Sequence, residues 1–592
     1  MLAIAALVLA ACDGGSQYLD PATCRHAPAP LAVTPQTPAA VADRLPLQTS
    51  GGSIVDSHGK PVKLASVNWY GAESPDLVPS GLDVRPVDAI AEHIKQLGFN
   101  SVRLPWSNYM LECDPVVSDD SVTKDGRGNP AYRGMHAMAV FDHVVRALAH
   151  QGLLIILDNH GSDPGFNDPG GPDGLWFNDR YPESQWLADW KDMAGRFARV
   201  PAVVGADLRN EPSKDSSGTE ATWGDGTSHD WRLAAERAGD QVLNVNRNLL
   251  IMVEGTGSGG DLHNASQQQV TLSPACPPPN QPSCTQVTDK LVYAPHDYMN
   301  FQTSHNREYP DLQNTLNMRW GDLSRGKEPH PVWVGEFGTC NTGPACVMPQ
   351  PYSSSSGCLA KDPGEHIVEG VWFANLIHYL AEPGNDFSWS YWPLNGTRPS
   401  GGVLHPELAR GATECYGVLD QDWSGVANLD LCRALQSIQT PVHRPASPLS
   451  PSRHESCAIG PYVPVPNPGA GTGAGAPTPA PKAPPTVIPC LNRAFDEYVL
   501  LSQPRSCADY AYEGTQGGGV NLSDIRWSNW GGDEAQGTAI EQGFHLPFSH
   551  IPARISAVRP VQACGERVYS ELKAMSRYGS VTVRLHTCGG TP

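Results

Sequence analysis

The sequence predicts an α/β protein whose largest part is a (β/α)8 barrel, a TIM barrel, followed by a small β-rich domain containing disulfides. Two observations predict the barrel. From about residue 51 to residue 445, eight apolar strand-like runs alternate with amphipathic helical segments. Polar side chains collect where these runs end, at the edge that carries the active site in such barrels. A doubly wound open sheet is the alternative, but no GxGxxG motif follows the first run.

The eight strand-like runs are short and rich in apolar residues, as strands covered on both faces of a parallel sheet are. In chain order they are KLASVNW (63–69), SVRLPW (101–106), LLIILDNH (153–160), VVGADLRNEP (203–212), LLIMVEG (249–255), KLVYAPHDY (290–298), VWVGEFG (332–338) and FSWSYWPL (387–394). Helical segments such as VDAIAEHIKQLGF and SQWLADWKDMAGRFARV lie between them. The helix after the fifth run is weak, because a Pro-rich loop with Cys276 and Cys284 occupies that position.

The two ends of the chain differ in composition from the barrel. Residues 1–12, MLAIAALVLAAC, form an apolar run too short to span a bilayer, and it stops at small residues as a secretory signal does. Its end resembles a bacterial lipobox, which predicts an extracytoplasmic protein lipidated at Cys12; an ordinary cleaved signal peptide is the alternative. Residues 13–50 are expected to form a flexible tether. The Pro/Gly/Ala-rich residues 446–489 are expected to form a linker before the C-terminal domain at 490–592.

The charge of the chain argues against one class of partner. The formal net charge is −20, and no run is rich in lysine or arginine. Nucleic-acid binding relies on clustered basic side chains that release counterions from phosphates, so it is not expected. A neutral substrate rich in hydroxyl groups fits this charge better. The sequence leaves the oligomeric state undetermined.

The 15 cysteines are best explained as disulfides. If Cys12 is lipidated, the other fourteen of the 15 allow up to seven bridges in an oxidising compartment. Close spacing favours pairs that close loops, namely Cys276/Cys284, Cys340/Cys346 and Cys415/Cys432. No cysteine or histidine cluster has the spacing of a zinc site, and neither a metal nor another cofactor is expected.

Two glutamates are the candidate catalytic residues. Glu211 ends the fourth strand-like run and Glu336 the seventh, so the two positions can face each other across a barrel mouth. Cleavage of a glycosidic bond needs such a pair, with one carboxyl group protonated and the other ionised. A separation of about 5–5.5 Å allows direct attack and retention, whereas about 6.5–9.5 Å admits a water and leads to inversion. Either glutamate taken alone would more often be an ion-pair partner.

Polar residues near the two glutamates are candidates for support. Arg103 is a candidate to hold Glu336 ionised through a charge-assisted bond, and Tyr298 to donate a hydrogen bond to the same carboxylate. Asn210 is a candidate to bind a sugar hydroxyl. Each residue also has an ordinary alternative, as an ion-pair or turn residue.

Histidine and tryptophan residues complete the set of candidates. His160 and His296 are candidates to bind hydroxyl groups or tune the acid, although a single histidine is more often structural. Trp69 and Trp392 offer flat apolar faces that suit pyranose rings, with packing in the core as the alternative. Trp389 lies on the same run as Trp392, and the choice between them stays open.

Seven segments at or near the ends of the strand-like runs are, in chain order, NWYG, SVRLPW, LDNH, DLRNEP, APHDY, VGEFG and SWSYW. These segments resemble the successive strand-end motifs of glycoside hydrolase family 5, the cellulase A family. YPESQWLADW and WRLAAERAGDQVLNVN resemble its bacterial endoglucanase branch. The resemblance covers about residues 51–430 and implies a (β/α)8 barrel, a retaining mechanism and hydrolysis of internal β-1,4-glucosidic bonds in cellulose or a related β-glucan.

The resemblance also implies roles for single residues. Glu211, in the Asn-Glu-Pro motif, is implied to be the acid/base and Glu336 the nucleophile. Binding or support roles are implied for Arg103, His160, Asn210, His296, Tyr298 and Trp392. Two positions depart from the family, since similar endoglucanases often have Arg in place of Asn159 and His in place of Arg209. Cysteine-bearing insertions after the seventh and eighth runs put the choice of polysaccharide in doubt, because loops at this end shape the cleft.

Residues 490–592 include WSNWGGDEAQGTA, which resembles part of a small extracytoplasmic domain of actinobacterial secreted proteins and lipoproteins. The resemblance implies no activity. Trp527 and Trp530 are candidates for a sugar-binding platform, with packing in the domain core as the alternative. The cysteines of this domain, whose pairing stays open, are Cys490, Cys507, Cys564 and Cys588.

Two other functions stay open on the sequence. The same barrel is compatible with a different β-glycoside, namely β-mannan, the chain end recognised by an exo-β-glucosidase, or a glycolipid. A lipoprotein that binds carbohydrate without cleaving it is the third hypothesis, and the intact pair of Glu211 and Glu336 argues against it.

Overall fold

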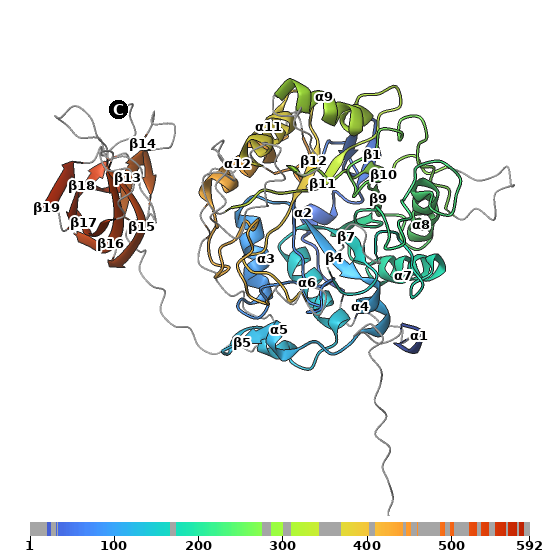
Figure 1. The fold of residues 1–592 in the computed structure, drawn as a ribbon, viewed down its shortest axis with the longest axis horizontal. Coiled ribbons are helices and arrows are strands. Elements are labelled where there is room, and N and C mark those ends of the chain that lie inside the picture. The colour runs from blue at the N-terminus through green and yellow to red at the C-terminus, as the bar shows by residue number, and fades with distance from the viewer. Residues whose placement is uncertain are drawn as a thin grey trace, which may run out of the picture. The chain divides into compact units, whose positions relative to one another are not determined.

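The chain divides into two units, Met1–Pro464 and Val465–Pro592. The computed structural model describes residues 21–24, 31, 34–165, 173–274, 286–299, 309–341, 369–401, 409–441, 446–451, 457 and 459, together with the strands between 486 and 584. Figure 1 shows the barrel in the first unit and the β-strands of the second. No helix in these described parts is long and apolar enough to cross a membrane.

Eight parallel strands form the barrel, in the order β10-β9-β8-β7-β4-β3-β12-β11. They are β3 (Ala65–Asn68), β4 (Ser101–Ser107), β7 (Leu154–Gly161), β8 (Val203–Asp207), β9 (Leu250–Val253), β10 (Leu291–Tyr293), β11 (Trp333–Phe337) and β12 (Ser388–Tyr391). Parallel bridges from Tyr293 to Val332 and from His296 to Glu336 join β10 to β11 and close the ring. All eight predicted strands are confirmed, and with them the (β/α)8 barrel.

Helices cover the outside of the barrel. They are α3 (Val87–Gln96), α4 (Asn108–Cys113), α6 (Ala137–His150), α7 (Glu183–Arg196), α8 (Trp231–Val245), α9 (Tyr309–Arg319), α11 (Glu369–Ala381) and α12 (Leu429–Gln439). In α7, Trp186, Trp190 and Met193 recur at helical spacing and are fully buried. Between β9 and β10, the described residues 254–274 and 286–290 contain no helix, as the weak pattern predicts.

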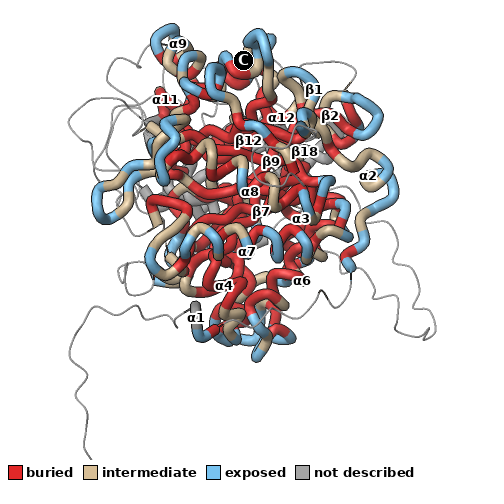
Figure 2. The backbone as a smooth tube through the Cα atoms, turned by 90° about the vertical axis from the view of Figure 1, so that its right-hand side faces the viewer, coloured by how far each residue is buried: buried red, intermediate tan, exposed pale blue. Residues whose placement is uncertain are grey.

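Shorter elements fill the connections. They are α1 (Pro21–Cys24), α2 (Ala39–Ala42), β1 (Gln48–Ser50), β2 (Ser53–Val55), α5 (Asp119–Val122), β5 (Thr123–Lys124), β6 (Arg127–Gly128), η1 (Pro130–Tyr132) and η4 (Gly321–Ser324). The buried residues of the barrel unit concentrate along its strands and the inner faces of the helices, as Figure 2 shows for β7, β9 and β12.

The barrel unit extends beyond the boundaries expected from composition. Part of the predicted tether packs instead on the barrel, because Leu47 is fully buried in a cluster with residues of the β-strands. The first residues of the predicted linker do the same: Leu449 joins this cluster, and the Ser447 hydroxyl donates a 2.7 Å hydrogen bond to Asp56. A few apolar side chains that find a buried site are enough to order segments whose overall composition is polar or Pro-rich.

Among the described residues of the barrel unit, two disulfides have both of their cysteines placed. Cys24 bonds Cys113, and Cys432 bonds Cys457. The expected pair Cys415/Cys432 is therefore wrong; sequence spacing does not determine which thiols meet once the chain has folded. Cys340 and Cys415 are each disulfide-bonded. The expected partners Cys276, Cys284 and Cys346 lie outside the described residues.

The second unit is a β-sheet domain, as predicted. Its sheet has the order β14-β13-β18-β17-β16-β15, with β19 paired to β18. The strands are β13 (Thr486–Leu491), β14 (Tyr498–Leu501), β15 (Val520–Asn529), β16 (Glu534–Gly543), β17 (Ile551–Ala563), β18 (Glu566–Ser576) and β19 (Gly579–Arg584). Neighbouring strands are antiparallel except β13 and β18. The side chains of the cysteines and tryptophans singled out in this domain lie outside the described residues.

Candidate active site

The two predicted catalytic glutamates meet at the carboxyl ends of the barrel strands. Glu336 belongs to β11, and Glu211 follows β8 by four residues. One carboxylate oxygen of each and one ring nitrogen of His296 all lie within 4.8 Å of one another. This separation suits direct attack on the sugar, since an inverting pair stands about 6.5–9.5 Å apart to admit water.

Glu336 is held by hydrogen bonds to both of its carboxylate oxygens. Arg103 Nη1 donates to Oε1 at 2.5 Å, and the Tyr298 hydroxyl donates to Oε2 at 3.0 Å. Both donors were expected from the sequence. Bonds of this kind fix the direction of the oxygens and favour the ionised form, which is the form that a nucleophile needs.

Arg103 lies fully buried at the centre of a larger group of acids. Its guanidinium is 2.8 Å from Asp207, 3.1 Å from Asp158 and 3.1 Å from Glu254. Burial alone would lower the pKa of Arg103, but these carboxylates and that of Glu336 raise it well above its ordinary value. The amide oxygens of Asn68 and Asn210 accept from the same guanidinium at 3.1 and 2.9 Å.

Glu211 has the environment of a proton donor. Burial raises the pKa of its carboxyl group; a hydrogen bond from His296 and the charge of that ring lower it, while the charges of Glu336 and Glu254 raise it further. The net shift is upward, so Glu211 keeps its proton to a higher pH than an exposed glutamate does. Glu211 thus has the raised pKa that a general acid requires, whereas Glu336 accepts hydrogen bonds from Arg103 and Tyr298 that orient a nucleophile.

His296 lies between these acids. Its Nδ1 is 3.1 Å from Glu211 Oε1 and 3.7 Å from Glu336 Oε2, and its Nε2 is 3.1 Å from Glu254 Oε1. Burial alone would lower the pKa of His296, but the charges of Glu254 and Glu336 and the bonds to Glu211 and Glu254 raise it well above its ordinary value. The ring therefore holds a proton to a higher pH than an exposed histidine does.

Residues 55–396 match the family described as Cellulase (glycosyl hydrolase family 5). The chain belongs to glycoside hydrolase family 5. An endoglucanase of Paenibacillus polymyxa is 34% identical over 374 residues, which cover 60% of this chain and 81% of the relative. The major extracellular endoglucanase of Xanthomonas campestris is 29% identical over 390 residues, covering 63% of this chain and 70% of the relative.

A solved structure has the same fold. The endocellulase from the archaeon Pyrococcus horikoshii matches with a TM-score of 0.52 and 26% identity, over 68% of this chain and 100% of its own. Complexes of that endocellulase with cellotetraose have also been solved. Family membership makes this protein a glycoside hydrolase, and its retaining mechanism agrees with the short distance between Glu211 and Glu336.

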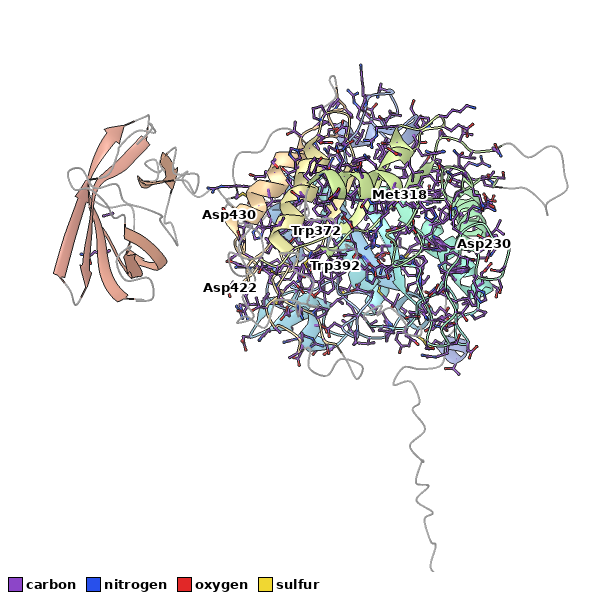
Figure 3. The ribbon with its side chains drawn as sticks, turned by 45° about the horizontal axis from the view of Figure 1, so that its top comes forward. Asp230, Met318, Trp372, Trp392, Asp422 and Asp430 are labelled. Atoms are coloured by element: carbon purple, nitrogen blue, oxygen red, sulfur yellow. A yellow bond between two sulfur atoms is a disulfide. The ribbon has the colours of Figure 1, made fainter. Side chains whose placement is uncertain are left out.

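The aromatic residues of this family 5 enzyme are now distinguished by burial. Trp392, labelled in Figure 3, follows β12 and is only partly buried. Its ring stacks on His160 at 5.5 Å and on Tyr70 at 4.7 Å between ring centroids. Trp69 and Trp389 are fully buried. The prediction that Trp69 offers a face to a sugar is therefore wrong. Its ring packs in the core, and its Nε1 donates a hydrogen bond to the backbone oxygen of Ser80.

His160 is fixed by an acid that precedes it on the same strand. Its Nδ1 is 2.7 Å from Asp158 Oδ2. Burial alone would lower the pKa of His160, but the charge of Asp158, its hydrogen bond and the charge of Glu73 raise it. Because its ring also stacks on Trp392, His160 sets the orientation of the indole that faces the site.

The two departures from the family lie side by side. Arg209 Nη1 donates to Asn159 Oδ1 at 3.1 Å, and Nη2 donates to the backbone oxygens of Asp173 and Leu175. Both side chains are fully buried. The Arg209 guanidinium follows the neighbouring strand and lies beside Asn159. A positive charge is therefore present next to position 159, although residue 159 itself is uncharged.

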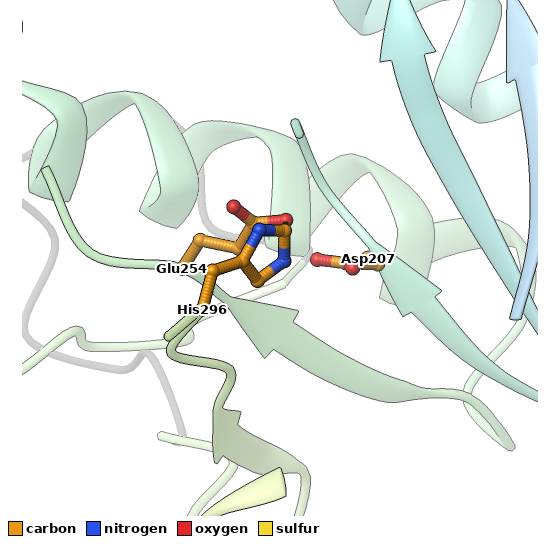
Figure 4. A group of neighbouring side chains, drawn as sticks. All are labelled: Asp207, Glu254 and His296. Carbon is orange, nitrogen blue, oxygen red and sulfur yellow. Dashed lines mark ion pairs between the residues drawn. The ribbon is translucent and has the colours of Figure 1, made fainter. Parts of the chain in front are cut away.

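Sequence reasoning missed four acids of the site. They are Glu73, Asp158, Asp207 and Glu254. Glu254 directly follows the apolar run LLIMV, just as Glu211 and Glu336 end their own runs, so the same signal was present in the sequence. Asp207, Glu254 and His296 bring ligand-type atoms within 4.8 Å of one another (Figure 4), but the Arg103 guanidinium already contacts both of these acids, at 2.8 and 3.1 Å.

Proposed function

We propose that this protein is an endo-β-1,4-glucanase that cleaves cellulose or a related β-glucan by double displacement. The approach of the Glu211 and Glu336 carboxylates within 4.8 Å carries the mechanism. The substrate class is supported by relatives that are endoglucanases and by the cellotetraose complexes of a structural relative. Trp392, partly exposed and stacked on His160, offers aromatic surface that suits a pyranose ring.

The first step forms a bond between the enzyme and the sugar. A Glu336 carboxylate oxygen attacks the anomeric carbon while Glu211 gives its proton to the glycosidic oxygen, so that bond breaks and the leaving chain departs with a new hydroxyl group. In the second step, ionised Glu211 takes a proton from water, whose oxygen attacks the same carbon and releases Glu336. Two inversions leave the configuration of the sugar unchanged, and Glu211 regains its proton.

The experiment is product analysis on cello-oligosaccharides, β-glucans and β-mannans. Internal cleavage of cellopentaose and longer chains is expected, and Glu211→Ala and Glu336→Ala are each expected to lose at least the ~10²–10⁴-fold that acid–base assistance contributes. Release of monosaccharide alone from the chain end would identify an exo-β-glucosidase, and cleavage restricted to mannan or to a glycolipid would replace the glucan. Binding of glucan oligomers without cleavage, unchanged in Glu336→Gln, would identify a carbohydrate-binding protein.

We further propose that the enzyme acts outside the cytoplasm, anchored to a membrane through a lipid on Cys12. The support is the apolar run that ends at Cys12 and the disulfides Cys24–Cys113 and Cys432–Cys457, which persist in oxidising compartments. Expression in a bacterial host and fractionation are the test. The wild-type protein is expected in the membrane fraction and Cys12→Ser outside it; equal distribution would reject the lipid anchor.

A further inference from the structure

Glu254 uses both carboxylate oxygens on the catalytic machinery. It follows β9 and is fully buried. Its Oε2 accepts a 2.8 Å hydrogen bond from the backbone nitrogen of Glu211. Its Oε1 lies 3.1 Å from His296 Nε2 and accepts from Arg103 Nη2 at 3.1 Å. Figure 4 shows its side chain and that of His296 converging from separate strand ends.

The backbone of Glu211 needs such a fixed acceptor. Its φ of +48° lies in the left-handed region, which non-glycine residues adopt rarely and only where the surroundings impose it. A charge-assisted hydrogen bond that its amide donates to a buried carboxylate supplies that constraint. The bond also fixes where the Glu211 side chain begins, and so where its proton is delivered.

The turn that follows Glu254 is shaped around these contacts. A Cβ on Gly259 would lie 2.7 Å from Glu254 Oε2 and 3.0 Å from His296 Cγ, so only glycine fits there. Ser258 donates its backbone NH to the oxygen of Pro212, the residue after Glu211. The turn therefore holds the Glu254 carboxylate and the Glu211 segment in one packed unit.

His296 extends the reach of Glu254 to the Glu211 carboxyl group. One ring nitrogen faces Glu254 Oε1 and the other lies 3.1 Å from Glu211 Oε1. His296 therefore has an acidic side chain near each ring nitrogen, Glu254 on one side and Glu211 on the other. Glu254 thus acts on Glu211 at two points, its amide and its side chain.

We infer that Glu254 is the positioning residue of the acid/base, holding the Glu211 amide directly and the Glu211 carboxyl group through His296. The inference rests on the proposed double-displacement mechanism. It assigns to Glu254 no contact with substrate. Removing its charge should therefore impair proton delivery to the leaving group more than attack by Glu336.

The test compares leaving groups in the full-length protein. For Glu254→Gln, we expect kcat/KM to fall about 10–100-fold on phenyl β-cellobioside, whose leaving group needs a proton, as part of the ~10²–10⁴-fold that acid catalysis contributes. On 2,4-dinitrophenyl β-cellobioside, which leaves without a proton, kcat/KM should fall less than about threefold. Azide, a nucleophile that needs no general base, should raise kcat of the variant on the dinitrophenyl substrate and yield β-cellobiosyl azide.

Equal losses on the two substrates, or no loss on either, would overturn the inference. Glu112→Gln removes another buried glutamate, on α4, and should change both values less than about twofold. If Glu254→Gln does not fold, Glu254→Asp supplies the same comparison, because aspartate keeps the charge but is too short to hold both contacts. If the wild-type protein cleaved neither cellobioside, the proposed function would fail and the inference with it. If the wild type cleaved both and only the Glu254 comparison failed, the inference alone would be overturned.

Discussion

At the scale of residues, the site is organised around the buried charge of Arg103. One guanidinium contacts Glu336, Asp207, Asp158 and Glu254, and each contact is with a different strand end. Carboxylates so close together repel one another and would otherwise take up protons. Burial and the charge of Glu254 raise the pKa of Asp207, whereas the pKa of Asp158 is lowered because the charges of Arg103 and His160 outweigh its burial. The cluster thereby gives neighbouring acids different affinities for a proton.

The raised pKa of Glu211 predicts the alkaline side of the activity profile. A general acid works only when protonated, so activity is present below the pKa of Glu211 and is lost as the pH rises through it. Burial places that pKa above the ordinary value of 4.5. We expect kcat/KM on phenyl β-cellobioside to fall with a midpoint above this value, approaching tenfold per pH unit. Measured on the dinitrophenyl substrate, Glu211→Ala should lack this limb; an identical limb in variant and wild type would assign it to another group.

The sequence predicted the residues that touch the reaction better than those that support them. Glu211 and Glu336 stand near strand ends, and they and Arg103 belong to recognisable motifs. Glu254 has the same strand-end position, but its partners are a backbone nitrogen and a histidine from another strand, which only the closed barrel brings together. Trp69 shows the opposite error: it was a candidate to bind the sugar, but its ring is fully buried. A tryptophan at the end of a strand gives the same sequence pattern whether its ring is buried or open to the site.

At the scale of elements, α4 and α7 meet through buried acids. Asp189 on α7 accepts hydrogen bonds from Asn108 on α4 at 2.6 Å and from Gln185 at 2.9 Å. Burial and the charge of Glu112 on α4 raise the pKa of Asp189 well above its ordinary value. Folding therefore takes up a proton at this contact, which makes the stability of the helix pair depend on pH.

The sign of that dependence follows from the direction of the shift. An acid whose pKa is raised on folding binds more protons in the native state, so stability is full below the unfolded value of about 3.9 and declines as the pH rises towards the folded value. Glu112→Gln replaces the repelling acid with an amide that can donate to Asp189. We expect its melting temperature, followed by calorimetry, to fall less than that of the wild type between pH 4 and pH 8. A steeper fall in the variant would contradict this account.

The periodicity of the sequence predicted the strands of the barrel but not the short elements that pack against it. Eight runs of apolar residues bounded by polar ones are a strong pattern, and each contains a strand. The hairpin of β1 and β2 was missed because its strands are three residues long and lie in a segment with a polar composition. Which short segments dock on a barrel depends on the surface left uncovered there, and no local pattern records that surface.

At the scale of the molecule, every site residue lies in one of the two units. The site residues fall between Asn68 and Trp392, within the unit that ends at Pro464. The family match, residues 55–396, lies in the same unit. Because the catalytic pair and the described groups that hold it belong to the barrel unit, we expect removal of the β-sheet unit to leave hydrolysis of soluble substrates intact.

The place of truncation decides whether the barrel unit stays stable. A chain ending at Pro464 keeps Leu449 in its buried cluster and Cys457 bonded to Cys432, and we expect its kcat/KM on a cello-oligosaccharide to match the full chain within about twofold. A chain ending at residue 445, the boundary that composition suggests, loses both. The stabilisation lost with a disulfide that closes 25 residues is about 3–4 kcal/mol in the loop-entropy account, and the loss of one buried leucine side chain removes about 2 kcal/mol more.

The shorter chain should therefore inactivate at a temperature several degrees lower, with kcat/KM at 25 °C affected far less. Half-lives across a range of temperatures measure the difference between the two truncations. Cys457→Ser in the full chain separates the disulfide from the packing of Leu449, because it opens the bridge and leaves the leucine in place. If the chain ending at 464 lost activity as well, the β-sheet unit would have to contribute to the barrel or to its substrate, and the two units could no longer be treated as independent in function.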